Sequence, residues 1–167
     1  FSLFVAHSVP HARVFAFEPI PPIYESLQTN AELYPHEIHT LPYGLSRCAQ
    51  EAEFTYYPNV SIISGRFANF EEESRVVGSY LRDHTESGAL LLDASLVKDL
   101  LVDRLQTKSF QCTLKSLSGA MQELGVDQID LLKVDVEKSE MEVLEGIDPA
   151  DWSRIQQVVV EVHDMRG

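Results

Sequence analysis

Cysteine is scarce in this sequence of 167 residues, which contains only Cys48 and Cys112. No CxxC motif is present, and no pair of histidines lies near either cysteine. Because structural zinc sites need four such ligands at short spacings, the sequence predicts no zinc site. The two cysteines could form one disulfide, but two free thiols are favoured, since reducing compartments keep thiols reduced.

Basic residues are also few. Lysine and arginine number 13 against 26 aspartates and glutamates, which gives a formal net charge of −13. This excess of negative charge disfavours binding to the phosphate backbone of nucleic acids and to anionic membrane surfaces. No apolar run approaches the roughly 20 residues that span a bilayer, and no signal peptide is recognisable. We therefore expect no nucleic acid or membrane partner, and a cytoplasmic location.

Boundary signals are missing at both ends of the sequence. The first residues, FSLFVAHS, are typical of the middle of an apolar helix, and the last, VVVEVHDMRG, of a strand that runs into a loop. We therefore expect a fragment of a longer chain. With 44% apolar and 23% charged residues, the composition is typical of a folded globular protein, and the length suits a single domain, residues 1–167.

Most of the chain alternates between buried strands and helices. The apolar run VFAF directly before Glu18 indicates a buried strand, and the prolines that follow suit the first turn of a helix. Similar patterns predict strands at 12–18, 51–58, 109–117, 129–136 and 155–163, the third with the alternation of an edge strand, and a strand followed by a turn over 38–46. The predicted helices are 1–8, 22–34, an acidic helical part at 71–105, a short helix ending at Gly125, and 137–146. This order predicts an α/β fold with a mainly parallel sheet.

Three ionisable side chains stand at the ends of predicted strands, where α/β proteins bind ligands. Glu18 could accept both hydrogen bonds of a ribose diol, or it could cap the following helix, as the helix dipole favours. Asp135 could face the ligand cleft, and it could also cap the helix that follows it. His163 could act as a general base near neutral pH, or it could be an exposed loop histidine.

Charged residues also interrupt the apolar runs of the last two strands. Lys133 and Asp135 are two residues apart and so share one face of their strand, and Glu161 and His163 repeat this spacing. Because an unpaired buried charge is costly, we expect neighbouring parallel strands with an ion pair between Lys133 and Glu161. Alternatively, these side chains extend to the edge of the sheet and reach solvent.

Three segments resemble the FkbM family of S-adenosylmethionine-dependent methyltransferases. They are VFAFEPIPPIYESLQTN, IDLLKVDVEKSEMEVLEGI and QQVVVEVH, and they occur in the family's order over most of the chain. The segments FTYYPNVSIISGRFA and EKSE are further similar to FkbM domains associated with polyketide and nonribosomal peptide synthetases. The sequence departs from the broad family at Lys138 and Ser139, where that family has Gly-Ala.

This resemblance implies a class I methyltransferase fold, a Rossmann-like three-layer sandwich with a mainly parallel sheet, here truncated at both ends. Residues 71–105 would be an acidic helical insertion that forms a lid or a wall of the acceptor site, or simply a solvated face. The family's first strand and glycine-rich turn would precede the sequence, and its last two strands would follow. The implied reaction is transfer of a methyl group from S-adenosylmethionine, usually to a hydroxyl oxygen of a secondary metabolite or sugar.

The resemblance also implies roles for particular residues. Glu18 would bind the cofactor's ribose, Asp135 would face its methionine and methyl region, and His163 would remove the hydroxyl proton of the acceptor. Near the adenine we expect Gly44 and Leu45, and Ser61 and Ser64 could contact cofactor or acceptor, although plain loop polarity explains them equally well. No metal is required, since a metal at Asp135 and His163 would lack a third ligand. The expected partners are a small-molecule or carrier-bound acceptor and other domains of a polyketide or nonribosomal peptide synthetase.

Two other functions remain open from the residues alone. An NAD-dependent oxidoreductase would use the same acidic residue for its ribose, and the upstream glycine pattern that separates the two classes lies outside the sequence. A non-catalytic scaffold domain derived from a methyltransferase would also keep this fold. Retention of Glu18 favours cofactor binding over the scaffold.

Overall fold

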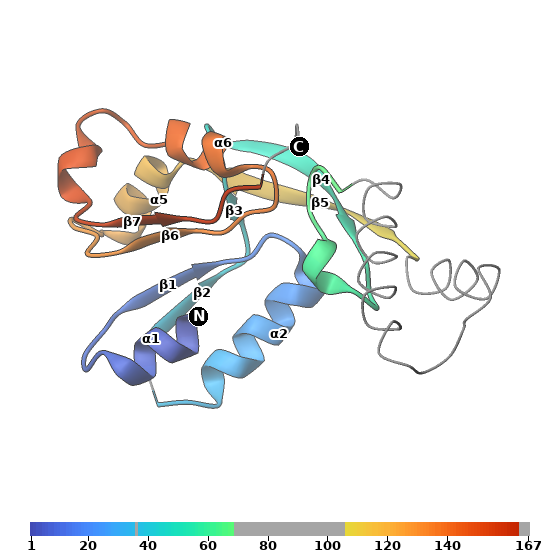
Figure 1. The fold of residues 1–167 in the computed structure, drawn as a ribbon, viewed down its shortest axis with the longest axis horizontal. Coiled ribbons are helices and arrows are strands. Elements are labelled where there is room, and N and C mark those ends of the chain that lie inside the picture. The colour runs from blue at the N-terminus through green and yellow to red at the C-terminus, as the bar shows by residue number, and fades with distance from the viewer. Residues whose placement is uncertain (36, 69–105, 164–167) are drawn as a thin grey trace, which may run out of the picture.

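The computed structural model describes residues 1–35, 37–68 and 106–163. The predicted acidic helical segment 71–105 lies outside these residues. In the part of the chain that is described, the fold is mixed α/β, and the strands form three hydrogen-bonded groups in the orders β1-β2, β3-β5-β4 and β6-β7 (Figure 1).

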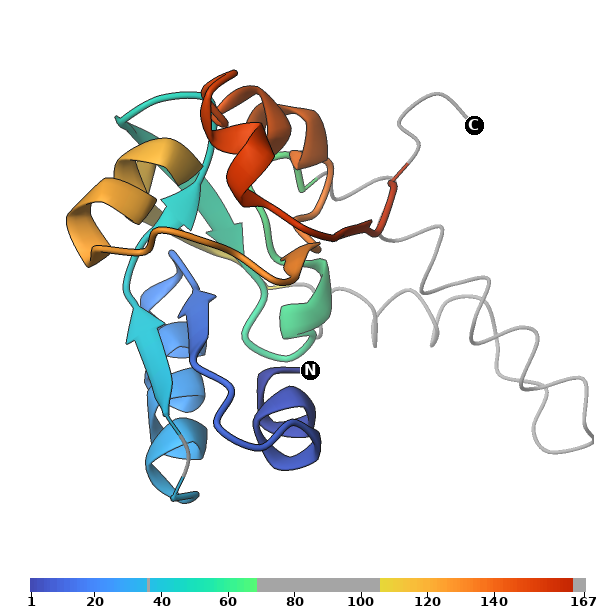
Figure 2. The ribbon, with the colours of Figure 1, turned by 90° about the vertical axis from the view of Figure 1, so that its left-hand side faces the viewer.

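The first strand pair is a parallel β–α–β unit. β1 (Val14–Phe17) pairs in parallel with β2 (Ile38–Leu41), and α2 (Pro21–Glu32) connects them and packs against β2 (Figure 2). Two prolines open α2, where their fixed φ suits the first turn and no backbone donor is lost. α1 (Ser2–Ser8) packs against β1. The first predicted strand and the first two predicted helices are confirmed.

The second group is a three-stranded mixed sheet. β5 (Lys108–Lys115) lies in its centre, with the two-residue β3 (Gly44–Leu45) parallel on one side and β4 (Gln50–Tyr56) antiparallel on the other. A 3-10 turn, η1 (Ser61–Ile63), follows β4 within the predicted loop 59–70. The predicted strand at 51–58 is thus confirmed with a shift of one or two residues.

The strand and turn predicted over 38–46 are present, but the turn leads into a second short strand that was not predicted. The segment forms two strands, β2 and β3, which belong to different sheets. Pro42 between them has no backbone N–H to continue a ladder. Gly44 then packs so closely that an added Cβ would lie 2.7 Å from Leu114 Cδ2. The chain can therefore change direction at this point and enter the second sheet.

The prediction of an edge strand at 109–117 is wrong, because β5 has a partner on each side. Its alternation has another origin. Cys112 and Leu114 are buried on one face, whereas Gln111 and Thr113 are exposed on the other. A central strand of a partly antiparallel sheet shows this pattern when one of its faces meets solvent.

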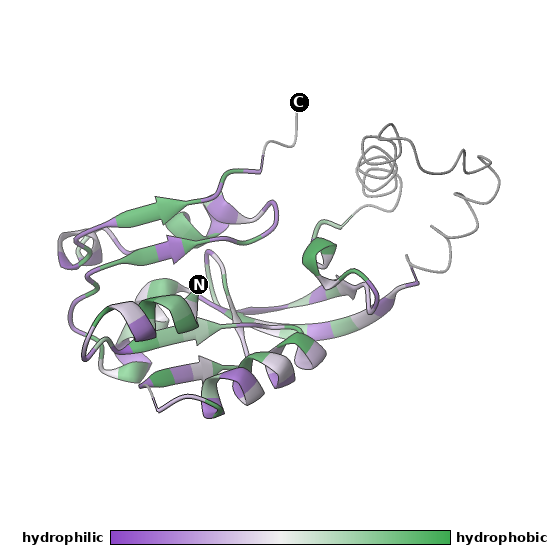
Figure 3. Ribbon diagram, turned by 60° about the horizontal axis from the view of Figure 1, so that its bottom comes forward, coloured by the Kyte–Doolittle hydropathy of each residue, from purple (hydrophilic) through white to green (hydrophobic). Residues whose placement is uncertain are grey.

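The third group is the parallel pair of β6 (Leu132–Val134) and β7 (Val158–Val160). α5 (Leu117–Leu124) precedes β6, and α6 (Glu140–Glu145) lies in the crossover to β7 together with a second 3-10 turn, η2 (Asp151–Arg154). A buried apolar cluster joins the two helices to β6, and β7 beside it is coloured hydrophobic along its length in Figure 3. The cluster consists of Leu117, Met121, Leu132, Val134, Val143 and Ile147.

Glycines end both helices, for different physical reasons. Gly125 ends α5 with a φ of 63°, a left-handed conformation that glycine adopts without strain. Gly146 ends α6 with a φ of −82°, so no special backbone conformation is needed there. An added Cβ at Gly146 would instead lie 2.2 Å from the backbone oxygen of Ser46. This close approach locks the end of α6 to the turn between β3 and β4.

The turn between β6 and α6 shortens both elements relative to the prediction. Strand and helix were expected to meet at 136 and 137, but β6 ends at Val134 and α6 begins at Glu140. Within this turn Lys138 has a φ of 61°, which costs a residue with a Cβ roughly 1 kcal/mol. The resemblance places glycine at this position in the broad family, and the backbone conformation explains that preference.

The predicted α/β class with parallel strand pairs is thus confirmed. A single three-layer sandwich remains a prediction, because the described strands form three separate ladders. Among the helices that the structure describes, none is both long and apolar enough to cross a bilayer.

Candidate functional site

The candidate residues gather at one edge of the fold. β1, β6 and β7 run in the same direction in Figures 1 and 3, so their carboxyl ends open on the same side. Glu18 directly follows β1, Asp135 directly follows β6, and His163 lies three residues beyond β7. We refer to this side of the molecule, defined by Glu18, Asp135 and His163, as the carboxyl edge.

Glu18 is held between β1 and the start of α2. Its backbone N–H donates to the oxygen of Leu41 at 3.1 Å, and its Oε1 accepts from the N–H of Ile20 at 2.8 Å. Burial raises the pKa of Glu18 from 4.5 to about 7, although the hydrogen bond from Ile20 lowers it. Glu18 thus contacts the N-cap residue of α2, although α2 has no side-chain cap on its first turn. This contact occupies one carboxylate oxygen, and no residue in the described part of the chain bonds to the other.

Gly44 lies next to Glu18 in space. A Cβ added at Gly44 would be 3.2 Å from Cγ of Pro19, the residue that follows Glu18. The turn after β2 therefore lies against the residue that follows Glu18, and a position of Gly44 near an adenine stays a prediction. Leu45 differs, since its side chain packs against the buried cluster. A contact of Leu45 with an adenine ring stays a prediction.

The predicted ion pair between Lys133 and Glu161 is wrong, although β6 and β7 are parallel neighbours as expected. The ammonium of Lys133 pairs with the carboxylate of Asp135 on the same face of its own strand. Lys133 also lies over the ring of Phe1, with Nζ 5.3 Å from its centre. A partner two residues away needs no crossing between strands, which explains why the local pair forms.

Asp135 is consequently an ionised carboxylate with a nearby cation. The hydrogen bond from Lys133 lowers the pKa of Asp135, and burial opposes this effect. Glu161 lies beside it, since the N–H of Glu161 donates to the oxygen of Val134 at 2.9 Å, and the two carboxyl groups interact. Asp135 is thus suited to accept hydrogen bonds at the carboxyl edge.

His163 lies between two glutamates of the β6–α6 connection. Its Nδ1 is 2.5 Å from Oε1 of Glu140, and its Nε2 is 3.3 Å from Oε2 of Glu137. The hydrogen bond with Glu140 raises the pKa of His163, and burial lowers it. The negative charges of Glu137 and Glu161 raise it further. The alternative of an unattached loop histidine is therefore wrong.

Glu140 was not identified from the sequence. It is buried, with 8% of its surface exposed, and it begins α6 directly after the N-cap Ser139. A signal was available in EKSE, where two glutamates three residues apart can lie near one another once a turn and helix follow the strand. What the sequence alone could not reveal was that both would face the end of β7.

The two serines of the loop after β4 differ. Ser64 is buried, and its Oγ accepts from the N–H of Tyr57 at 3.0 Å, so it stabilises the turn. Ser61 is exposed, and its predicted contact stays a prediction. The loop does lie against the carboxyl edge. A Cβ at Gly65 would be 3.3 Å from Cβ of Glu137, and Arg66 bonds Glu142 of α6 at 2.6 Å.

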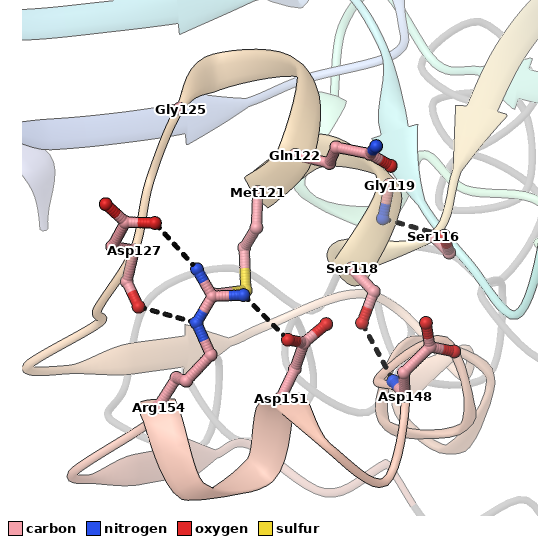
Figure 4. Close-up of a pocket in the computed structure, with 10 residues that line it drawn as sticks. All are labelled: Ser116, Ser118, Gly119, Met121, Gln122, Gly125, Asp127, Asp148, Asp151 and Arg154. Atoms are coloured by element: carbon pink, nitrogen blue, oxygen red, sulfur yellow. Dashed lines mark hydrogen bonds and ion pairs between the residues drawn. The ribbon is translucent and has the colours of Figure 1, made fainter.

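Two further observations limit the ligands that the described residues can hold. They contain no group of three or more His, Cys, Asp or Glu side chains that could hold a metal ion. A cavity of about 530 Å³ lies between α5 and η2, away from the predicted site residues (Figure 4). Arg154 in this cavity bonds Asp151 at 2.8 Å and Asp127 at 3.1 Å, so its guanidinium is already paired.

Comparison with known proteins agrees with this arrangement. The model of the methyltransferase FkbM domain matches residues 1–166. The chain is 40% identical over 168 residues to the AMB antimetabolite synthetase AmbE of Pseudomonas aeruginosa, covering 99% of this chain and 8% of AmbE. It is 33% identical over 174 residues to the 31-O-demethyl-FK506 methyltransferase FkbM of Streptomyces tacrolimicus, covering 100% of this chain and 62% of that protein.

A third relative is the methyltransferase sdnD of Sordaria araneosa, at 34% identity over 174 residues, covering 100% of this chain and 63% of sdnD. The chain thus spans less than two thirds of each of these relatives. No solved structure matches it. Because the family match extends over almost every residue, the chain belongs to the methyltransferase FkbM domain family.

Proposed function

We propose that this chain forms part of an S-adenosylmethionine-dependent methyltransferase that methylates a hydroxyl group of a secondary-metabolite or sugar acceptor. The observation that carries the proposal is Glu18, a half-buried carboxylate at the end of a core strand, with one oxygen that no described residue bonds. Family membership supports methyl transfer. Two relatives are named for such acceptors, one for the 31-O position of FK506 and one for a hexuronic acid.

The residues of the carboxyl edge fit the ribose of this cofactor. A diol donates hydrogen bonds, and a carboxylate at the end of a parallel strand is the acceptor that nucleotide-binding α/β folds use. Burial opposes the charged form of Glu18 in the free chain. Two donated hydrogen bonds would favour the charged form, so ligand binding should lower its pKa. Oε1 of Glu18 can still accept from the N–H of Ile20, and this bond keeps the side chain oriented.

The charge of the edge also fits the other end of the cofactor. When bound, S-adenosylmethionine supplies an electrophilic methyl group on a positively charged sulfonium. Asp135, Glu137 and Glu161 are three carboxylates that lie near the ammonium of Lys133 and the imidazole of His163. Carboxylates at this position attract a cation such as the sulfonium. Most of the rate would come from alignment of the acceptor oxygen with the methyl carbon.

The setting of the reaction is part of the same proposal. The relation to AmbE, of which the chain covers 8%, supports a domain that works beside other domains of a synthetase on a small-molecule or carrier-bound acceptor. A Rossmann-like three-layer sandwich and a cytoplasmic location complete the proposal. A non-catalytic scaffold is the second candidate, because the bond from the N–H of Ile20 gives Glu18 a structural role at the start of α2.

Calorimetric titration with S-adenosylhomocysteine tests the proposal. It is carried out on this chain and on a longer chain that contains it, each with Glu18→Gln and with Glu25→Gln as the matched control on the exposed side of α2. Loss of a charged hydrogen-bond acceptor costs about 1.5–3 kcal/mol, so Glu18→Gln should weaken binding by about 10-fold to 150-fold. Glu25→Gln should bind as the parent does. Absence of binding to both parent chains would favour the scaffold, and NADH would be titrated next.

A further inference from the structure

The two ring nitrogens of His163 have unequal surroundings. Nδ1 is 2.5 Å from Glu140, whose side chain keeps only 10% of its surface exposed. Nε2 is 3.3 Å from Glu137, whose side chain is 38% exposed. The first contact is short and shielded from water, whereas the second is long and partly solvated. A ligand can therefore displace the second contact much more easily than the first.

The burial of Glu140 explains why the first contact should persist. A carboxylate taken out of water needs a cation or several donors to compensate its lost hydration. The imidazole of His163 is the basic group that Glu140 contacts in the described part of the chain. Releasing His163 would leave Glu140 buried and uncompensated. The pair also connects the end of β7 to the first residue of α6.

This arrangement determines which nitrogen keeps its proton. An ionised carboxylate only accepts hydrogen bonds, so Nδ1 must carry a hydrogen to bond Glu140. When the ring is neutral, the lone pair is then on Nε2. In free histidine the neutral ring carries its hydrogen mainly on Nε2. The contact with Glu140 therefore reverses the usual tautomer. The groups that face the ring are Glu137, Glu140 and Glu161, with Asp135 and its partner Lys133 next to them.

We propose that Glu140 is a positioning residue, which holds the Nδ1 hydrogen of His163 and makes Nε2 the atom that takes the proton of the acceptor hydroxyl. This inference rests on the proposed function. The acceptor hydroxyl replaces Glu137 at Nε2. Its proton passes to Nε2 while its oxygen bonds the methyl carbon and the carbon–sulfur bond breaks, with the electron pair going to sulfur. Glu140 and Glu137 then stabilise the imidazolium, which returns its proton to water.

The first test is NMR of the chain with ¹⁵N-labelled histidine, in which the His163 signals are those lost in His163→Gln. Long-range proton–nitrogen spectra show which nitrogen carries the hydrogen in the neutral ring. We expect the Nδ1–H tautomer. Glu140→Gln, which keeps an oxygen acceptor but removes the charge, should lower the pKa of His163. Glu145→Gln is the matched control, because Glu145 lies on the same helix and pairs with Arg47 instead.

A neutral His163 in the Nε2–H form would overturn the proposal, as would an unchanged pKa in a folded Glu140→Gln chain. The second test uses an acceptor on which methyl transfer is measured in the longer chain. There the acid limb of kcat should follow the pKa of His163 and move to lower pH in Glu140→Gln. An acid limb that stays in place while the NMR pKa moves would show that His163 is structural and would refute the base role.

The two proposals fail in different ways. If S-adenosylhomocysteine does not bind, the proposed function is wrong, and the base role of His163 is wrong with it, whatever the NMR spectra show. If the cofactor binds but His163 is in the Nε2–H form, the methyltransferase function stands and the role of Glu140 is refuted.

Discussion

Replacing Glu18 by glutamine should stabilise the folded chain at alkaline pH while it weakens cofactor binding. Burial raises the pKa of Glu18 from 4.5 to about 7, so the folded chain binds this proton more tightly than the unfolded chain does. A group with a raised folded pKa contributes stability that is complete below its unfolded pKa and is lost as the pH rises through its folded pKa. Stability should therefore fall between about pH 4.5 and pH 7.

The magnitude follows from the same values. A tenfold change in proton affinity corresponds to about 1.4 kcal/mol, so a rise from 4.5 to about 7 makes the ionised form costly by about 3 kcal/mol. Glu18→Gln removes this cost and keeps an oxygen that can accept from the Ile20 N–H. At pH 8 the variant should unfold at a urea concentration about 1–2 M higher than the parent.

Urea denaturation at pH 5 and pH 8, followed by circular dichroism, measures this difference. The exposed Glu25 provides the control, since Glu25→Gln should change stability little at either pH. If Glu18→Gln is no more stable than the parent at pH 8, then Glu18 is solvated in the free chain. The picture of a carboxylate kept in an unfavourable position for a ligand would then be wrong.

Three other outcomes can be measured on the same chain. The affinity for S-adenosylhomocysteine should rise with pH up to about 7 and level off above it, because only ionised Glu18 accepts both hydrogen bonds of a diol; calorimetry at several pH values checks this. Gly146→Ala should destabilise the fold by about 1–3 kcal/mol or more in thermal denaturation, since its Cβ would lie 2.2 Å from the Ser46 oxygen, whereas Gly119→Ala should cost less. At Lys138, where φ is 61°, Gly should be tolerated better than Val by about 1–2 kcal/mol in chemical denaturation; equal stability of the two would contradict the left-handed conformation.

The sequence predicted well wherever a pattern reflects burial over several residues. The apolar run before Glu18 and the prolines after it determine β1 and the start of α2, because these preferences act locally. It failed where a single contact between distant segments decides the outcome. The division of 38–46 depends on Gly44 packing against Leu114, about 70 residues later, and no local signal contains that contact.

The candidate site shows the same difference between what the sequence predicted and what it missed. The ends of the strands could be located from the sequence, and Glu18, Asp135 and His163 do follow β1, β6 and β7, whereas their roles stay predictions. Their partners could not be located, because a partner depends on how the side chains turn after the strand ends. Lys133 bonds Asp135 rather than Glu161, and His163 bonds Glu140, which had not been considered.

The raised pKa values of Glu18 and His163 act on stability in the same direction. The contribution of the His163 contact is complete below the ordinary pKa of 6.5 and is lost as the pH rises through the raised value. Asp135 has the opposite sign, since its lowered pKa contributes stability that is lost as the pH falls below 3.8. The free chain should therefore be most stable in mildly acidic solution, whereas binding and proton transfer need Glu18 ionised and His163 neutral.

The Glu18→Gln variant should still lose stability as the pH rises above 6.5, because His163 loses its proton. This loss should be smaller in the double variant that also carries His163→Gln. If the two variants lose stability equally over that range, the contact between His163 and Glu140 is not a source of stability.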